Sequence, residues 1–231
     1  MRFVAVKTAE QQAAVLLHRG RERLVRQRTG LVNALRAHLA EFGIIAPQGL
    51  RNVGRLIALV RDEDDARLPD LVSQVLEVLA AQIEQLEAAV AAIEKQLMAW
   101  HKSNPISQRL ASVPGIGPII ATAIAATVVE PSGFRSGREF AAWLGLVPRQ
   151  NSTGGKHRLK RGNQYLRRLL INGASANLLR SKATNADPWV IGLRRRRPSL
   201  VVAVALANKT ARIAWAVMHR HENYQRVAAA A

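Results

Sequence analysis

A serine surrounded by basic residues stands out in the second half of this 231-residue chain. Ser152 precedes two adjacent glycines, which give the backbone freedom to bend. Four side chains near it in sequence can carry positive charge: Arg149, Lys156, His157 and Arg158. A serine that attacks a phosphodiester needs activation, and its transition state needs positive charge nearby. The residues alone allow a nucleophilic serine or, more simply, a loop that only binds phosphate.

Two further features indicate contact with phosphate. The basic residues continue beyond the serine at Lys160, Arg161 and Arg167. The run LASVPGIGPIIA, residues 110–121, predicts helix, tight turn, helix. Its glycines, Gly115 and Gly117, allow a phosphate to approach backbone N–H groups at the start of the second helix. This run resembles the helix-hairpin-helix motif, which binds DNA without reading its sequence; a plain helical hairpin is the alternative.

The net charge of +18 is unevenly distributed. Residues 1–61 carry 11 basic and 3 acidic groups, residues 62–102 carry 3 and 9, and residues 103–231 carry 20 and 4. A basic surface of this size is typical of a protein that binds a polyanion with salt-dependent affinity. A generically positive surface is the alternative.

Composition excludes several other classes. The chain has no cysteine, so disulfides and thiolate metal sites are excluded, which fits a reducing cytoplasm. The first residues lack a secretion signal, and the most apolar stretches, 118–129 and 200–207, are too short to span a bilayer. We therefore expect no membrane association. The acids Asp62 to Asp65 point in divergent directions and suit the start of a helix, so we expect no metal site in this chain.

Helical periodicity predicts the elements of the first half. A capping box at Thr8 and Gln11 and an apolar stripe predict a helix from Thr8 to Phe42. Five arginines lie in the middle of this helix: Arg19, Arg21, Arg23, Arg26 and Arg28. They form either a solvated face or a face that follows the phosphates of a nucleic acid. A shorter helix is expected over 50–60. Heptad spacing then runs from Val72 to Trp100, which favours a dimeric coiled coil over an antiparallel helix pair within one chain.

Short helices and glycine turns are expected beyond Pro105. Ser136 and Glu139 form a capping box, with Gly145 as the C-cap, and another helix follows Asn163. A final helix is expected from Ser199 to about His221, after the run Arg194–Arg197. The predicted fold is all-α: a helical segment over 1–67, a coiled coil over 68–102, and a compact helical domain over 103–231 with the helix-hairpin-helix-like motif and the serine loop.

Several motifs occur in a recognisable order. They are FAAWLGLVPRQNSTGGK at 140–156, RGNQYLRRLL at 161–170, NKTARIAW at 208–215, and NALR with EFG at 33–36 and 41–43. Together they resemble the C-terminal transposase domain of the insertion-sequence "one-ten" family, closest to its "eleven-eleven" subgroup, and the helix that follows the family's first domain. The resemblance covers essentially the whole chain.

The resemblance implies a DNA transposase. Family members begin with a RuvC-like α/β domain whose carboxylate tetrad holds divalent metal, expected to be Mg²⁺, where paired ions stabilise the attacking and leaving oxygens. A coiled coil and a domain with a catalytic serine follow; by position that serine is Ser152. Members act as oligomers, and a structured RNA guides the choice of DNA. The implied partners are therefore DNA, a guide RNA and further copies of the chain, in the cytoplasm and on the nucleoid.

The chain departs from the family pattern at two points. It starts where the family's first domain is finishing, and no residues match the tetrad, so we expect a truncated transposase that cannot complete recombination alone and needs no cofactor itself. After Leu159 the family has a Gly-Ile-Ser or Gly-Ile-Thr step that is missing here, which shortens the link from Ser152 to Asn163. The competing hypotheses are a non-enzymatic remnant that binds DNA or RNA and oligomerises with full-length transposase, and a purely structural coiled coil.

Overall fold

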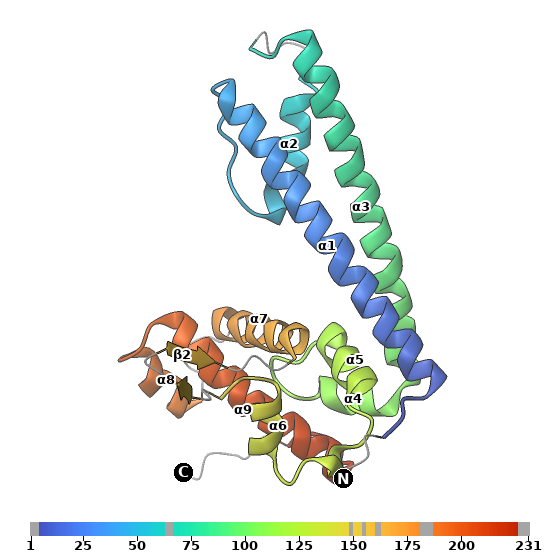
Figure 1. Ribbon diagram of the computed structural model, residues 1–231, viewed down its shortest axis with the longest axis vertical. Helices are drawn as coiled ribbons and strands as arrows, with labels where there is room; N and C mark the ends of the chain where they lie inside the picture. Colours follow the sequence, from blue (N-terminus) through green and yellow to red (C-terminus); the bar gives the residue numbers. More distant parts are fainter. Residues whose placement is uncertain are drawn as a thin grey trace. The chain divides into compact units, whose positions relative to one another are not determined.

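The computed structural model describes residues 5–62, 67–147, 150–153, 156–159, 163–180 and 187–225. Within these ranges the regular secondary structure is helical apart from one short two-stranded ribbon, so the predicted all-α class is confirmed (Figure 1). The elements are α1 (Ala9–Glu41), η1 (Leu50–Asn52), α2 (Val53–Val60), α3 (Asp70–Ser103), α4 (Pro105–Ala111), α5 (Pro118–Thr127), η2 (Pro131–Gly133), α6 (Gly137–Trp143), β1 (Gln150–Thr153), β2 (Lys156–Leu159), α7 (Gln164–Arg180), α8 (Pro188–Arg194) and α9 (Ser199–Arg220).

The chain divides into two compact units. One is Leu16–Gln96, and the other combines Met1–Val15 with Leu97–Ala231. The predicted segments 1–67 and 68–102 thus fall mostly in one unit. The predicted serine domain over 103–231 falls wholly in the other.

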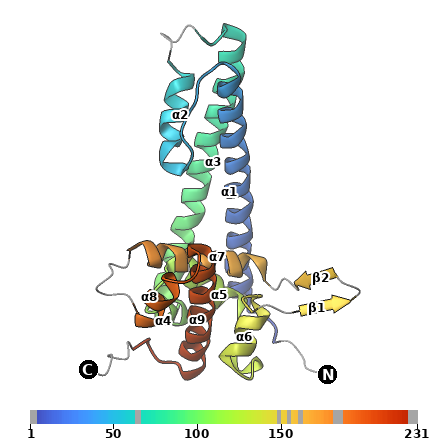
Figure 2. The same cartoon turned by 90° about the vertical axis from the view of Figure 1, so that its left-hand side faces the viewer.

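Leu16–Gln96 is built on an antiparallel pair of long helices, α1 and α3 (Figure 2). Arg21 of α1 forms an ion pair of 2.6 Å with Glu94, whereas Arg28, farther along α1, lies 3.7 Å from Glu87. The residue numbers of the partners on α3 decrease as those on α1 increase, so the two helices run antiparallel. Helix α2 completes the unit's core, whose buried members are Leu35, Leu39, Ile44, Ala46, Val53, Leu56, Ile57, Val60, Leu68, Leu76, Ala80 and Ile83.

The apolar residues that recur at heptad spacing along α3, from Val72 to Trp100, form a seam that packs inside the chain. Every seventh residue of the seam in this unit is buried: Leu76, Ile83 and Val90 are between 0% and 5% exposed. Ile93 of the seam approaches Gly20 of α1, where an added Cβ would lie 3.6 Å from Ile93 Cδ1. The antiparallel pair within one chain, which the spacing left open, therefore accounts for the seam.

Helix α9 is the centre of the C-terminal unit. It contacts α4, α6, α7, α8 and η2. By length and composition it is apolar enough to cross a membrane, but one face fills the unit's core with small and medium side chains: Val202, Ala203, Leu206, Ala207, Ala211, Ala214, Val217 and Met218. Alanines let neighbouring backbones approach, and an added Cβ at Gly137 of α6 would lie 3.0 Å from the Arg212 carbonyl oxygen.

The predicted caps are confirmed where local hydrogen bonds define them. Thr8 and Gln11 exchange backbone-to-side-chain hydrogen bonds of 3.1 Å at the start of α1. Ser136 Oγ accepts from the N–H of Glu139 at 3.3 Å, while the Glu139 carboxylate accepts from the N–H of Arg135. The C-cap of α6 is Leu144 and not the predicted Gly145, which follows it with φ +73°, a conformation that a glycine adopts without strain.

Candidate nucleic-acid interface

Ser152 lies on a short antiparallel ribbon. Strand β1 pairs with β2, and Ser152 stands directly opposite His157 in the register. The neighbouring pairs are Asn151 with Arg158 and Thr153 with Lys156. The sequence predicted only a polar loop here.

The ribbon is connected to the C-terminal unit at two anchored positions. On the entry side Leu146 is buried, and the side-chain amide of Asn208 in α9 donates to its carbonyl oxygen over 3.4 Å. On the exit side Asn163 caps α7, because its Oδ1 accepts from the N–H of Leu166 at 3.1 Å. These anchors fix where the chain leaves and rejoins the folded unit.

The predicted phosphate-binding residues fall into three groups. Lys156 and Arg158 lie on β2. Arg167 lies half-buried in the first turn of α7, beside Arg168, whose guanidinium is 5.6 Å from the centre of the Tyr165 ring. Cations in the first turn oppose the helix dipole, so an anion bound there would relieve an unfavourable arrangement. The remaining three, Arg149, Lys160 and Arg161, lie outside the described residues.

The glycine turn predicted as helix-hairpin-helix-like connects α4 to α5 and gives its two glycines different surroundings. Gly115 has φ +88° and packs against α7: an added Cβ at Gly173 would lie 2.2 Å from the Gly115 carbonyl oxygen. Gly117 is exposed, precedes α5 as its N-cap, and has nothing within 4 Å of an added Cβ. The conformation of Gly115 therefore has a packing reason, and Gly117 is the glycine that a phosphate can approach.

The arginines of α1 do not form one free basic face. Arg21 and Arg28 pair with glutamates of α3, and Arg26 pairs with Glu22 at 2.7 Å. Arg19 and Arg23 are exposed. Pairing within the chain thus uses three of the five cations that the sequence offered as a phosphate-tracking face.

Carboxylates are dispersed in the described part of the chain. No group of three or more histidines, aspartates or glutamates lies close enough there to hold a metal ion. Residues 63–66, which include most of the acidic run, lie outside the described residues. The residues in view do not fit the family's carboxylate tetrad, and no metal-dependent step is assigned to them.

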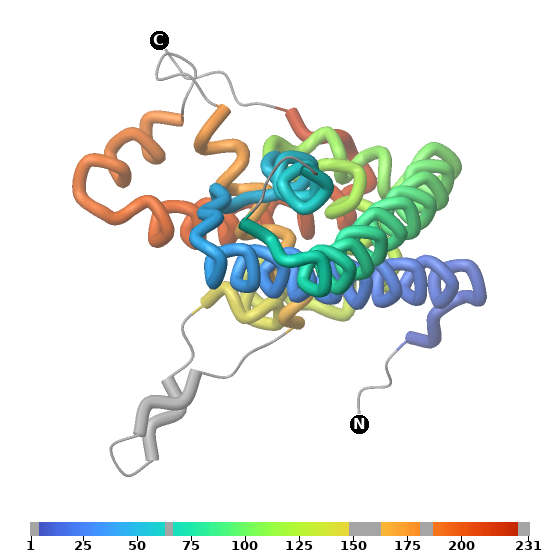
Figure 3. Tube along the Cα trace, turned by 90° about the horizontal axis from the view of Figure 1, so that it is seen from above, coloured from blue at the N-terminus to red at the C-terminus, as the bar shows by residue number. Residues whose placement is uncertain are grey.

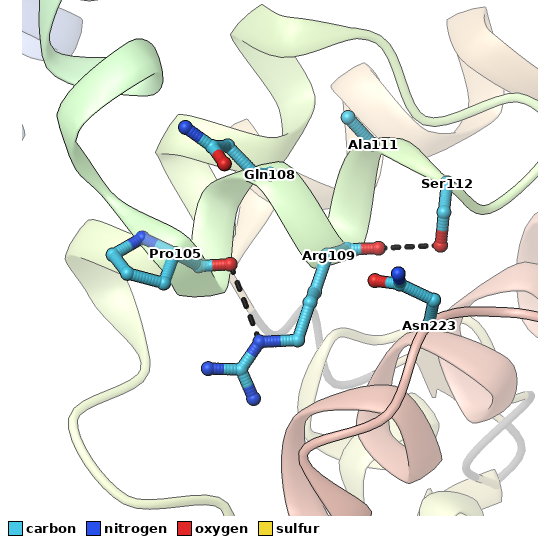
Figure 4. A pocket seen from close by; sticks show the side chains of 6 residues that line it. All are labelled: Pro105, Gln108, Arg109, Ala111, Ser112 and Asn223. Carbon is cyan, nitrogen blue, oxygen red and sulfur yellow. Dashed lines mark hydrogen bonds between the residues drawn. The ribbon is translucent and has the colours of Figure 1, made fainter.

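An open pocket of about 550 Å³ lies beside α4 (Figure 4). Its lining residues are Pro105, Gln108, Arg109, Ala111, Ser112 and Asn223. Ser112 Oγ closes one side, because it accepts from the N–H of Tyr224 at 2.9 Å and donates to the carbonyl of Arg109 at 2.6 Å. The pocket offers one cation and several amide groups, which is too few charges to define a ligand.

The sequence interpretation missed the pairing of Ser152 with His157. Two residues, Gly154 and Gly155, separate QNST from KHRL, and a Gly-Gly pair between two short segments is a β-hairpin signal. With that signal the register follows directly, since residues equidistant from a two-residue turn face each other. His157 thereby becomes a candidate partner of the serine.

Comparison with known proteins identifies relatives along nearly the whole chain. The family described as "Transposase IS116/IS110/IS902 family" matches residues 107–189. A "Probable family 20 transposase" of Pseudomonas aeruginosa is 49% identical over 97% of this chain and 69% of its own length. The transposase for insertion sequence element IS1111A of Coxiella burnetii is 38% identical over 97% of this chain and 64% of its own.

A third relative, the transposase for insertion sequence element IS1328 of Yersinia enterocolitica, is 41% identical over 94% of this chain and 66% of its own. The chain therefore spans about two thirds of the length of these relatives.

Proposed function

Because the chain belongs to the IS116/IS110/IS902 transposase family, we propose that it acts in DNA transposition, with Ser152 as the nucleophile. The observation that carries the proposal is the register of the ribbon, in which Ser152 is paired with His157. A serine nucleophile needs a general base, and histidine is the residue type that most often serves as one.

The proposed step is a transesterification at a DNA phosphodiester. His157 accepts the Ser152 hydroxyl proton as Oγ bonds to phosphorus. The bond from phosphorus to the leaving deoxyribose oxygen breaks, and that oxygen takes up a proton from water. The hydroxide so formed is neutralised by the proton that His157 releases. The product is a phosphoserine ester that keeps the energy of the broken linkage for a later rejoining step. Neither an oxidant nor a reductant is needed.

Basic residues near both ends of the ribbon support a role in holding phosphate. Lys156 and Arg158 flank His157 on β2, and Arg167 follows in the first turn of α7. Arg149, Lys160 and Arg161 add three charges in the adjoining sequence. Positive charge around a phosphoryl group stabilises the negative charge that builds up in the transition state. Gly117 is proposed to contribute a separate, sequence-independent DNA contact through the backbone, whereas Gly115 packs the turn against α7.

Several parts of the reaction are proposed to come from outside these residues. Mg²⁺ would be held by the carboxylate tetrad that the family carries in its first domain, where it would stabilise charge on oxygen. A structured RNA would choose the DNA. We further propose that the chain works on the nucleoid in the bacterial cytoplasm, and that by itself it does not complete strand joining.

We also propose self-association through α3, on a face that α1 leaves open. Leu71, Val75 and Val78 are spaced at helical intervals and are 75%, 57% and 57% exposed. Exposed apolar rows of this kind mark association surfaces. Light scattering should show an oligomer for the native chain and a monomer for the triple serine variant with unchanged helical content. Equal masses for both chains would contradict the proposal.

A covalent adduct tests the proposed function. Purified chain is incubated with labelled duplex DNA carrying its element's ends, RNA and Mg²⁺, and a denaturing gel reports DNA that migrates with protein. The adduct is expected for the native chain and for Thr153→Ala, and is expected to vanish in Ser152→Ala. An adduct that survives in Ser152→Ala overturns the assignment of the nucleophile. Strand joining by the chain alone overturns the proposal that it does not complete strand joining by itself.

The alternative is a non-enzymatic chain that binds DNA or RNA and assembles with full-length transposase. The excess of 20 basic over 4 acidic groups in residues 103–231 supports it. It predicts salt-dependent retention of nucleic acid without any adduct. The same gel separates the two functions, because binding alone does not survive denaturation.

A further inference from the structure

Four consecutive arginines form a feature that the serine chemistry does not use. Arg194 ends α8, Arg195 is its C-cap, and Arg196 and Arg197 lead through Pro198 into α9. All four are exposed. Figure 3 shows the chain reversing direction between α8 and α9 at the edge of the C-terminal unit.

The backbone of this turn is held in place from both sides. The N–H of Arg195 donates to the Ile191 carbonyl at 3.3 Å, and that of Arg196 to the Leu193 carbonyl at 3.2 Å. Val190 is buried and anchors α8 against α9. At the start of α8, the Asp187 carboxylate accepts from the N–H of Trp189 at 2.9 Å. The arginines therefore project from a fixed support.

The charge of the turn is not neutralised by the described part of the chain. Asp187 is the acid nearest in sequence. Its carboxylate forms an ion pair with the ammonium of Lys209 and accepts from the N–H of Trp189 as the N-cap of α8. Within the described residues the four guanidinium groups form no hydrogen bond or ion pair. Like charges in adjacent positions repel, so the arrangement is costly unless a polyanion lies against it.

We propose that the Arg194–Arg197 turn binds the sugar–phosphate backbone of duplex DNA, as a contact additional to the serine ribbon. The proposal rests on the proposed function, since it assumes that the C-terminal unit engages DNA. Guanidinium groups bind phosphate oxygens bidentately and stay charged at every physiological pH. A stretch of four residues reaches at most about 14 Å. A duplex presents one phosphate per about 1.7 Å of its axis, so each arginine has a phosphate within reach.

The test compares two variants with the same net charge. One replaces Arg194, Arg195, Arg196 and Arg197 with glutamine. The other replaces four exposed arginines elsewhere: Arg51, Arg55, Arg135 and Arg138. Binding to a labelled duplex of unrelated sequence is measured between 50 mM and 300 mM salt. Circular dichroism and thermal unfolding confirm that both variants fold.

The turn variant is expected to weaken binding by at least about tenfold at 0.1 M salt, and to lower the slope of log K against log salt by about 3 to 4, near 0.9 per lost phosphate contact. The dispersed variant is expected to change the slope by less than about 1. A variant with lysine at all four turn positions should keep most of the slope, because the charge remains.

Equal losses in both glutamine variants overturn the proposal, because they assign binding to net charge alone. A loss confined to a structured RNA probe, with duplex DNA unaffected, also overturns it and makes the turn an RNA contact. A loss of self-association without a change in the DNA slope assigns the turn to a second copy. If the native chain binds no DNA at all, the proposed function fails, a result that the slopes distinguish from failure of the turn alone.

Discussion

The carbonyl oxygen of Gly115 faces the backbone of Gly173 so closely that a Cβ on Gly173 would lie 2.2 Å from it. Ile120 Cδ1 would lie 2.6 Å from the same Cβ. The turn between α4 and α5 is thereby packed onto α7, the helix into which the serine ribbon leads. The glycine turn and Arg167, in the first turn of α7, are therefore connected through the same helix.

Replacing Gly173 with alanine is expected to destabilise the chain by roughly 1–3 kcal/mol, the cost of overpacking a close contact. The destabilisation would be larger if alanine did not have a higher helix propensity than glycine. Gly192 of α8 is the matched control, since nothing lies within 4 Å of an added Cβ there. Gly192→Ala should be neutral or stabilise by about 0.5–1 kcal/mol. Urea unfolding measures both, and equal values would show that the contact is not tight.

His18 is expected to make stability pH-dependent. Burial and, secondarily, the positive charge of Arg21 lower the pKa of His18 from 6.5 to about 4. Between these values the unfolded chain binds a proton that the folded chain does not. Stability is thus fully present above pH 6.5 and falls as the pH drops towards 4, by up to about 3 kcal/mol.

The His18→Gln variant isolates this effect. Burial also lowers the pKa of His101, so the native chain carries a second contribution of the same sign. Unfolding free energies at pH 4, 5, 6 and 7 should therefore fall less steeply towards acid in the variant than in the native chain. Parallel curves would mean that His18 is not the buried neutral group described above.

Asn208 is expected to position the serine ribbon. Its amide donates to the carbonyl of buried Leu146, one of the anchors of the ribbon. Asn208→Ala should cost about 1 kcal/mol through an unsatisfied carbonyl and should lower the rate of adduct formation by more than that loss of folded protein explains. Asn172→Ala, at an exposed position of α7, serves as the control. If both variants are fully folded and form the adduct at the same rate, Asn208 has no positioning role.

Features set by neighbouring residues were predictable from the sequence. The capping boxes at Thr8 and Ser136 depend on hydrogen bonds within four residues, and both form. The heptad spacing predicted which face of α3 is buried. It could not identify the partner, because the same apolar row fits a second copy or another helix of the same chain. The structure fills the seam with α1.

Features set by the approach of distant segments were not predictable. From the sequence alone, the turn around Gly115 is predicted to bind phosphate. The fold brings Gly173, 58 positions away, against the Gly115 carbonyl, which gives this glycine a packing role. The sequence does not show that Arg21 and Arg28 are paired, because their partners Glu94 and Glu87 lie on α3, far away in the chain. The ribbon is a different case. Its Gly-Gly signal was present, but QNST and KHRL lack the apolar alternation that usually marks strands.

The most direct test of the central claim is to locate the DNA on the protein. The adduct formed by the native chain is digested with nuclease and protease, and mass spectrometry identifies the residue that carries the remaining nucleotide. Attachment to Ser152, with loss of the modified peptide in Ser152→Ala and a slower yield in His157→Gln, is the predicted result. A nucleotide on Thr153 or on any residue outside 150–159, or no modified peptide despite DNA binding, would contradict the account.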